Sequence, residues 1–304
     1  FVSGATEMGT GYLYTAVPQF VAEVFGVAPE EILVVVGDTD TTGYDHGIGG
    51  SRGAFTVGMV AKMAAERARQ NLFEAAASRY FGTRPDCLET ADGKIWVQGD
   101  GDNAISIAEV ALKEHLLHGG PIIGSASYLP QMDPIDPERV KGLSFPAFKG
   151  NTIGCHIALL EVDTETGAVT PLKYVAAHDV GRVVNPQAAE GQIEGGVALG
   201  LGFAVSEEMV FDETGALANR DFVDYKLPTC SDVPEVESVI CEIPSHYGPH
   251  GAKGLGEPTM APVAAVVGNA LFSATGRRIG ETPMSAERVF RALHNGRNSA
   301  QWGG

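Results

Sequence analysis

The sequence predicts an α+β fold of two mixed lobes, and three observations lead to this class. Apolar residues recur at helical intervals over residues 12–25 and 51–77, which predicts two helices. From Cys155 onward the pattern changes to β-rich runs separated by turn residues, before helical spacing returns near the C-terminus. Because helices and strands do not alternate strictly, mixed packing is favoured over a parallel sheet of βαβ units.

Length and composition indicate a globular chain of roughly two domains. Its 304 residues are 44% hydrophobic and 19% charged, which leaves ample material for a core. Residues 124–153 are rich in Pro and Gly, so they are expected to form an irregular connection. The first lobe then covers residues 1–123 and the second lobe covers residues 154–304.

The first lobe begins with the helix over 12–25, which is followed by a buried strand over 31–36 (EILVVV). A glycine-rich loop leads into the long helix, for which Ser51 is the expected N-cap. A short strand over 94–97 (KIWV) and a helix that starts after Ser106 complete this lobe.

The second lobe is expected to contain two hairpins, which turn about Asp163–Gly167 and Asp212–Gly215. The other elements expected there are a glycine-rich helix, a further strand and two closing helices, over residues 186–205, 236–244, 258–274 and 285–294.

The charge and the cysteines exclude several classes of protein. The formal charge is 21 − 38 = −17, whereas binding to nucleic-acid phosphates depends on clustered Lys and Arg. No apolar run approaches the roughly 18–20 residues that cross a bilayer, so no membrane partner is expected and the expected location is cytoplasmic. The cysteines form no C-x-x-C pair and the eight histidines form no H-E-x-x-H, which argues against a metal ion or iron–sulfur cluster ligated by this chain.

Glycine is over-represented and clustered. It accounts for 39 of 304 residues, about 13% against an average of about 7%. The clusters lie at 4–11, 43–53, 191–202 and 248–256. The loop over 43–53 precedes a helix N-terminus, which suits a phosphate, and Ser51 and Arg52 add a hydroxyl and a cation. It matches neither G-x-G-x-x-G nor a P-loop, so a mobile loop before a capped helix is an equal alternative.

Two further readings concern acid–base groups. Asp45 and His46 near Ser51 would suggest a hydrolase, but no G-x-S-x-G elbow is present and neighbouring loop residues rarely face one another as base and orienter. Glu257 precedes Pro258 at a helix start, where an acidic residue stabilises the helix dipole by about 0.3–1 kcal/mol. The alternative is that this carboxylate, on a glycine-lined rim, acts as a general base.

Four segments favour a cofactor-binding role: GATEMGTG, DVGRVVNPQAAEGQIEGGVALGLG, DFVDYKLPTCSDVPEV and GAKGLGEPTMAP, at 4–11, 179–202, 221–236 and 251–262. In this order and at this spacing they resemble the last part of the molybdenum-cofactor-binding subunit of the xanthine dehydrogenase/aldehyde oxidase family, the molybdenum hydroxylases. The resemblance implies the fold of the second molybdopterin-binding domain. It also implies a Mo-molybdopterin cofactor, of which the cytosine dinucleotide form is one alternative, with Mo held by the pterin dithiolene and not by the protein.

The resemblance also implies roles for individual residues. Glu257 of G-E-P removes the proton from a Mo-bound hydroxyl, whose oxygen attacks an aldehyde or N-heteroaromatic carbon. Gln192 contacts the pterin, and Arg52 is a partner for the cofactor phosphate. The other cofactor-binding positions it implies are Gly9, Thr10, Gly49, Gly50 and Ser51, of which Gly50 lies near Mo. Thr10 departs from the family pattern, since much of the family has Gln between these glycines.

A second departure concerns the extent of the chain. The family carries an earlier half of the molybdenum subunit that is not present in this sequence, and the first residue is Phe1, not Met. A fragment or a split subunit is therefore expected, completed by that N-terminal half and by partners that hold [2Fe–2S] clusters and FAD. The resemblance implies oxidative hydroxylation with water as the oxygen source and electrons passed to these partners. A scaffold or assembly subunit that has lost the cofactor, and the hydrolase using Ser51, stay as alternatives.

Overall fold

A computed structural model describes residues 1–45, 47–131 and 149–294, which form two compact units. The first unit consists of Phe1–Asn151 together with Pro244–Gly254, and the second consists of Thr152–Ile243 together with the chain from Leu255 onward. Mixed helices and sheets confirm the α+β class. The lobe boundaries at 1–123 and 154–304 stay a prediction. The compact units differ from these lobes in one respect, since the segment 244–254 belongs to the first unit.

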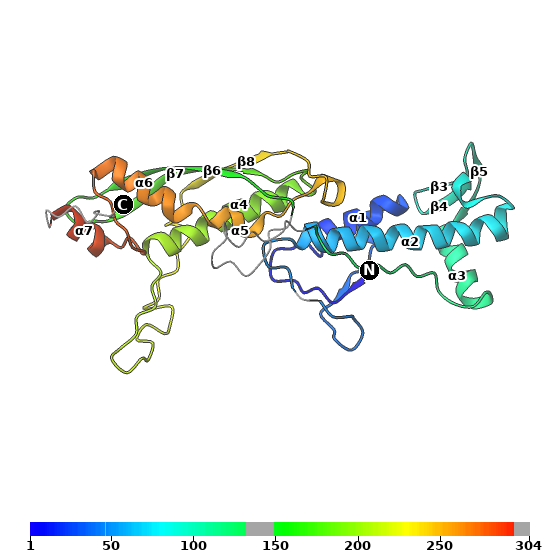
Figure 1. The fold of residues 1–304 in the computed structure, drawn as a ribbon, viewed down its shortest axis with the longest axis horizontal. Coiled ribbons are helices and arrows are strands. Elements are labelled where there is room, and N and C mark those ends of the chain that lie inside the picture. The colour runs from blue at the N-terminus through cyan, green and yellow to red at the C-terminus, as the bar shows by residue number, and fades with distance from the viewer. Residues whose placement is uncertain (46, 132–148, 295–304) are drawn as a thin grey trace. The chain divides into compact units, whose positions relative to one another are not determined.

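Two helices form the centre of the first unit. Helix α1 (Ala16–Phe25) packs along α2 (Gly58–Ala76), as Figure 1 shows, and buries Leu13, Val17 and Ala61 between them. The long helix extends at both ends by π-helical turns, η2 (Gly53–Val57) and η3 (Ala77–Phe81). The expected N-cap at Ser51 is wrong, because Ser51 has a left-handed backbone (φ 57°) and the helix begins at Gly53.

The strands of the first unit form two small sheets. β1 (Val2–Ser3) pairs in parallel with β2 (Val35–Val36), so the expected strand over 31–36 is shorter than predicted, because Pro29–Glu31 forms the 3₁₀ turn η1. β3 (Leu88–Ala91), β4 (Lys94–Val97) and β5 (Asp100–Ser106) form an antiparallel sheet, in which β4 is the predicted KIWV strand. Short 3₁₀ turns occupy Pro85–Cys87 (η4) and Pro249–Gly251 (η5).

The predicted helix after Ser106 is confirmed as α3 (Ile107–Leu117). The Ser106 hydroxyl accepts a hydrogen bond from the Glu109 backbone N–H at 3.0 Å, so Ser106 is the N-cap.

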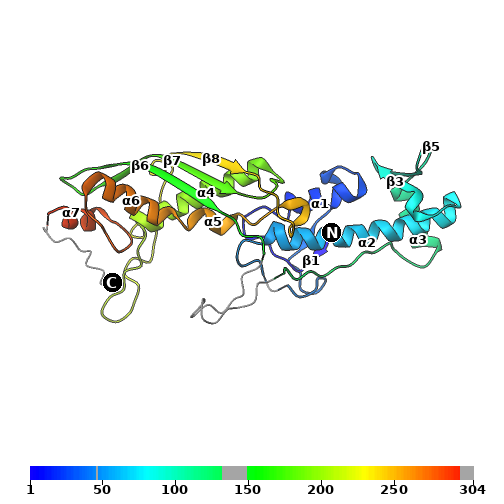
Figure 2. The ribbon, with the colours of Figure 1, turned by 45° about the horizontal axis from the view of Figure 1, so that its top comes forward.

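The second unit is a three-stranded sheet covered by helices on one face (Figures 1 and 2). β6 (Gly154–Val162) and β7 (Val169–Asp179) form the predicted hairpin about Asp163–Gly167, and β8 (Glu235–Cys241) pairs in parallel with β7. The helices are α4 (Pro186–Val205), α5 (Gly256–Met260), α6 (Val263–Thr275) and α7 (Ala286–His294). Tyr174 and Ala176 of β7 pack against Ile193 and Val197 of α4 and Val267 of α6 in the core.

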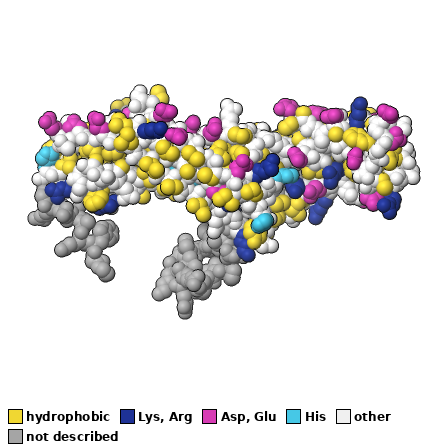
Figure 3. Space-filling model, turned by 90° about the horizontal axis from the view of Figure 1, so that it is seen from above, with side chains coloured by type: hydrophobic (Ala, Val, Ile, Leu, Met, Phe, Trp, Pro, Cys, Tyr) yellow, Lys and Arg dark blue, Asp and Glu magenta, His cyan; other side chains and the backbone are white. Residues whose placement is uncertain are grey.

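The other face of this sheet carries exposed apolar side chains, among them Ile157 and Leu159 of β6 and Val239 of β8. The ion pair of Lys173 with Glu237 (2.9 Å) also lies on it, and Figure 3 views the molecule from this side.

Two expectations do not follow the structure. The second hairpin, about Asp212–Gly215, is reduced to a single bridge between Phe211 and Leu217, so this segment is a loop with a turn. The connection over 124–153 shows no helix or strand from 124 to 131, and its residues 132–148 lie outside those that the structure describes. Across the described residues, no helix is long and apolar enough to cross a membrane.

Candidate functional site

Three of the four glycine clusters meet in the first unit. A β-carbon at Gly4 would collide with the carbonyl oxygen of Gly43, so the loops at 4–11 and 43–53 are in backbone contact. A β-carbon at Gly254 would likewise collide with the carbonyl oxygen of Ser51. The glycines allow backbones to approach more closely than any side chain would permit, and they gather three distant segments into one region.

The ring of Tyr12 joins the first of these loops to the helix start. A β-carbon at Gly53 would lie only 3.0–3.1 Å from the Tyr12 ring, and the Tyr12 hydroxyl donates to the carbonyl oxygen of Thr6 at 3.4 Å. Burial raises the pKa of Tyr12, and the charges of Glu7 and Asp45 raise it further. Tyr12 is therefore a neutral side chain that packs between this loop and the start of the helix.

The loop at 4–11 is organised by Glu7. Its carboxylate accepts hydrogen bonds from the backbone N–H groups of Gly9 (2.9 Å), Gly11 (2.8 Å) and Leu13 (3.3 Å), and from the Thr10 hydroxyl (3.2 Å). Partial burial raises the pKa of Glu7, but these hydrogen bonds outweigh burial and leave its pKa below the ordinary value. Sequence reasoning missed Glu7, although an acidic residue just before Gly-Thr-Gly was a usable signal.

The second loop turns sharply just before the long helix. Gly50 (φ 81°) and Ser51 (φ 57°) are both left-handed, and Arg52 directly precedes the first helical residue, Gly53. Gly49 and Gly50 are exposed, and no described atom lies within 4 Å of the place where a β-carbon of Gly49 would stand. This stretch of backbone is open to a ligand.

The two remaining predicted residues lie in the second unit, Gln192 on α4 and Glu257 on α5. The buried hydroxyl of Thr259 lies 2.7 Å from the carbonyl oxygen of Gly256 and 3.2 Å from that of Gln192, so it links the two helices. A β-carbon at Gly196 would collide with this hydroxyl, which explains a glycine there. The Gln192 side chain is half-buried and Glu257 is exposed.

Comparisons with known proteins identify the family of this chain. A family model described as the molybdopterin cofactor-binding domain matches residues 1–234. The chain belongs to this family. The resemblance to the xanthine dehydrogenase family is confirmed as well, because the putative xanthine dehydrogenase molybdenum-binding subunit of Escherichia coli (strain K12) is 32% identical over 296 residues.

Solved structures show the same fold. Quinoline 2-oxidoreductase from Pseudomonas putida 86 matches 96% of this molybdopterin-binding chain with a TM-score of 0.74 and 29% identity. Carbon monoxide dehydrogenase from Oligotropha carboxidovorans matches 95% with a TM-score of 0.78 and 24% identity, a likeness of fold alone. The chain spans only part of these relatives: 37% of the Escherichia coli subunit and 36% and 34% of the two solved chains.

Other chemistry finds less support in this molybdopterin-binding domain. Of the hydrolase residues, His46 lies outside the described part of the chain, and Asp45 accepts a hydrogen bond from the Gly47 N–H at 2.7 Å. The described residues hold no group of three or more His, Cys, Asp or Glu side chains that could bind a metal ion. His156 and His178 on β6 and β7 instead form a pair, with their Nε2 atoms 2.6 Å apart.

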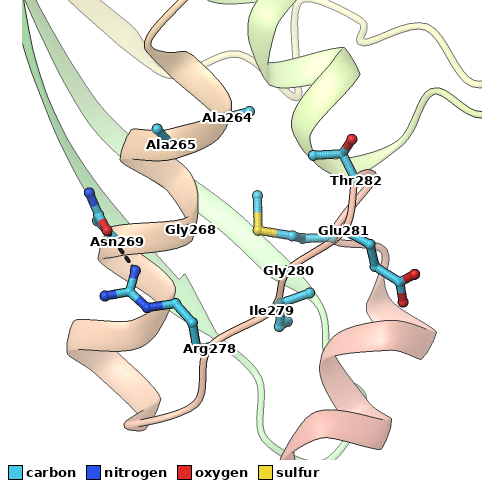
Figure 4. Close-up of a pocket in the computed structure, with 10 residues that line it drawn as sticks. Ala264, Ala265, Gly268, Asn269, Arg278, Ile279, Gly280, Glu281 and Thr282 are labelled. Carbon is cyan, nitrogen blue, oxygen red and sulfur yellow. Dashed lines mark hydrogen bonds between the residues drawn. The ribbon is translucent and has the colours of Figure 1, made fainter. Parts of the chain in front are cut away.

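A shallow hollow of about 400 Å³ lies in the second unit, between α6 and the segment that follows it (Figure 4). Ala264, Gly268 and Met284 line it, and at its edge Arg278 donates to the Asn269 side-chain oxygen at 2.6 Å. None of the residues predicted to bind the cofactor lines this hollow.

Proposed function

We propose that this domain is the C-terminal part of a molybdenum hydroxylase catalytic subunit, which hydroxylates an aldehyde or N-heteroaromatic substrate with water as the oxygen source. The observation that carries the proposal is the meeting of three glycine clusters in the first unit, which leaves Gly49 and Gly50 open to a ligand. The names of two relatives, xanthine dehydrogenase and quinoline 2-oxidoreductase, favour the N-heteroaromatic class. Because the chain spans about 37% of the first of these relatives, the proposed activity needs the remaining part of the subunit.

The residues present fit a bulky anionic cofactor. Backbone at Gly9 and Gly49 is approachable, because no described atom occupies the space of a β-carbon there. The helix start after Arg52 offers N–H groups and a positive dipole end to a phosphate, and the Arg52 guanidinium adds a cation. Gln192 adds a side-chain amide that both donates and accepts. Mo-molybdopterin is therefore the proposed cofactor, and its cytosine dinucleotide form is the finer proposal.

When bound, the cofactor supplies a redox centre that takes an electron pair from the substrate. The carboxylate of Glu257 is the proposed general base, which accepts the proton of the water-derived nucleophile as its oxygen attacks the substrate carbon. Glu257 is exposed in this chain, so the proposed reaction needs the cofactor and the rest of the subunit to exclude water from it.

Partners complete the proposed reaction. The relatives are subunits or parts of longer chains, which supports a multi-subunit enzyme. We propose that the N-terminal half of the molybdenum subunit closes the site, and that iron–sulfur and FAD subunits receive the electrons. The cytoplasm is the proposed location of this complex.

The test uses the whole enzyme complex that contains this chain. Glu257→Gln is expected to lower kcat by about 10²–10⁴-fold while the molybdenum content stays that of the wild type. Glu213→Gln, an exposed carboxylate in a turn of the same unit, is the matched control and is expected to be fully active. Full activity of Glu257→Gln with normal molybdenum would overturn the general-base assignment. A complex without molybdenum at every stage of purification would instead favour a scaffold subunit.

A further inference from the structure

The carboxylate of Glu7 is the main hydrogen-bond acceptor within the loop at 4–11. Its Oε1 atom receives the N–H groups of Gly9 and Gly11 and the hydroxyl of Thr10, and its Oε2 atom receives the N–H of Leu13. Hydrogen bonds to an ionised group are roughly twice as strong as neutral ones. Four of them on one carboxylate outweigh any single contact inside this loop.

Packing does not hold the loop at its two glycines. Gly9 (φ 98°) and Gly11 (φ 76°) have left-handed backbones, which other residues adopt at a cost. No described atom lies within 4 Å of a β-carbon built on either glycine, and Met8 between them and Glu7 is 68% exposed. The carboxylate of Glu7 therefore selects the conformation that the glycines merely permit.

This arrangement changes what Thr10 can offer to a ligand. The hydroxyl proton of Thr10 is directed at Glu7, so the side chain has only oxygen lone pairs left to accept with. The flanking N–H groups of Gly9 and Gly11 also point to Glu7. The backbone N–H of Thr10, in contrast, donates to no group in the part of the chain that the structure describes.

We propose that Glu7 is a positioning residue that fixes Gly9-Thr10-Gly11 so that the backbone N–H of Thr10, and not its hydroxyl, is the donor presented to the cofactor. This inference rests on the proposed function, because it takes molybdopterin as the ligand. It also accounts for a threonine at a position where a long side-chain donor would be expected: a main-chain donor does not depend on side-chain length. Glu7 acts through the loop and does not itself touch the cofactor.

The experiment compares four variants of the intact enzyme complex. Glu7→Ala removes the acceptor, Glu7→Gln keeps an oxygen for three of the four donors, and Thr10→Val removes the hydroxyl while it keeps the N–H. Glu23→Ala, an exposed glutamate on α1 of the same unit, is the matched control. The readouts are amide hydrogen exchange at residues 9–13 and the molybdenum content of the purified complex.

Glu7→Ala is expected to speed exchange at residues 9–13 by about tenfold or more and to lower the molybdenum content, while Glu23→Ala changes neither. Glu7→Gln is expected to restore most of the protection, which a loss of general stability would not predict. Thr10→Val is expected to retain molybdenum within about twofold of the wild type. Wild-type exchange in Glu7→Ala would overturn the positioning role.

Loss of molybdenum in Thr10→Val together with normal exchange at residues 9–13 would move the contact back to the hydroxyl and overturn the proposal. If Glu7→Ala does not fold, Glu7→Gln and Thr10→Val still decide it, because each preserves most of the loop contacts. A wild-type complex that lacks molybdenum would contradict the proposed function alone, since the exchange data still report on Glu7.

Discussion

The two units hold their candidate cofactor-binding groups by different means. In the first unit the candidate groups are backbone atoms of loops, which are brought together by glycines at 4, 43 and 254 and fixed by the Glu7 carboxylate. In the second unit they are side chains, Gln192 and Glu257, carried by helices that Thr259 links.

This difference predicts different responses to substitution. A backbone surface depends on the conformation and clearance of each loop residue, whereas a side chain on a helix depends on the packing of that helix. Glycine has a different purpose in each unit as well: in the first it lets loops touch, and in the second it lets α4 approach α5. Alanine substitutions test these purposes, when a glycine whose β-carbon would collide with a neighbour is compared with a glycine in the same unit whose β-carbon would meet open space.

The largest effect is expected in the second unit, at Gly196. Gly196→Ala places a methyl group on the buried hydroxyl of Thr259 and should lower the free energy of unfolding by about 2–3 kcal/mol, as overpacking does. Gly195→Ala, one residue earlier on α4, meets nothing within 4 Å and should raise it by about 0.5–1 kcal/mol, because alanine is the better helix former. Denaturant unfolding of the two variants measures the contrast.

The double variant Gly196→Ala/Thr259→Ala tests the assigned cause. It should recover part of the lost stability, since the colliding hydroxyl is gone. Equal stability of Gly195→Ala and Gly196→Ala would show that α4 and α5 are not in close contact. Glycine in the second unit would then not be explained by helix packing.

A smaller effect is expected in the first unit, at Gly254. Gly254→Ala directs a methyl group at the carbonyl oxygen of Ser51, a backbone atom that cannot rotate away, and should cost about 1–3 kcal/mol. Gly49→Ala has open space and should leave the free energy of unfolding within about 0.5 kcal/mol of the wild type. If the cofactor occupies that space, the molybdenum content of Gly49→Ala should nevertheless fall.

Gly49→Ala therefore distinguishes a glycine kept for folding from one kept for a ligand. Metal analysis of the purified complex, with thermal unfolding as the control for folding, gives both quantities from one preparation. Unchanged molybdenum content and an unchanged free energy of unfolding would show that the cofactor does not contact the loop at Gly49.

Local sequence features predicted the local structure well. The turn at Asp163–Gly167, the helix that starts after Ser106 and the helix over 186–205 all depend on residues within a few positions of each other, and each was confirmed. Asn185 caps that helix through its side-chain oxygen, which accepts from the Ala188 N–H at 3.0 Å. Such features are set by short-range hydrogen bonds, so the sequence alone suffices to predict them.

Long-range contacts explain what the sequence could not predict. The parallel pairing of β7 with β8 joins segments about sixty residues apart, and the sequence of neither strand predicts which strand it pairs with. Ser51 looks like an N-cap by residue type, yet its left-handed backbone lies against Gly254, two hundred residues later. For the site, the motifs named Gly9, Thr10 and Gln192 through resemblance. Glu7 was missed for a different reason: its hydrogen bonds reach only two to six residues along the chain, but residue types alone do not show which backbone N–H groups a carboxylate accepts from.

The smallest expected effect concerns a buried polar cluster of the second unit. His156 Nε2 lies 2.6 Å from His178 Nε2, and His156 Nδ1 lies 2.9 Å from the hydroxyl of Tyr174. Burial, and then the neighbouring His178, lower the pKa of His156 to about 4, and burial also lowers the pKa of His178. Between pH 6.5 and about 4 the unfolded chain therefore binds protons that the folded chain does not.

The sign of the pH effect follows from that difference in bound protons. The contribution of these histidines to the free energy of unfolding is fully present above pH 6.5. It falls as the pH drops toward 4, by at most about 1.4 kcal/mol per pH unit for each proton. Because His156 is only partly buried, a total loss of ~1–2 kcal/mol is expected for this residue. His156→Gln should flatten the pH dependence of denaturant unfolding, whereas the same change at the exposed His118 of the first unit should not. An unchanged slope in His156→Gln would mean that this pair does not titrate as a buried unit, and the acid sensitivity of the chain would then have to originate in other groups, such as the hydrogen-bonded carboxylates of Glu7 and Asp163, whose pKa values are lowered.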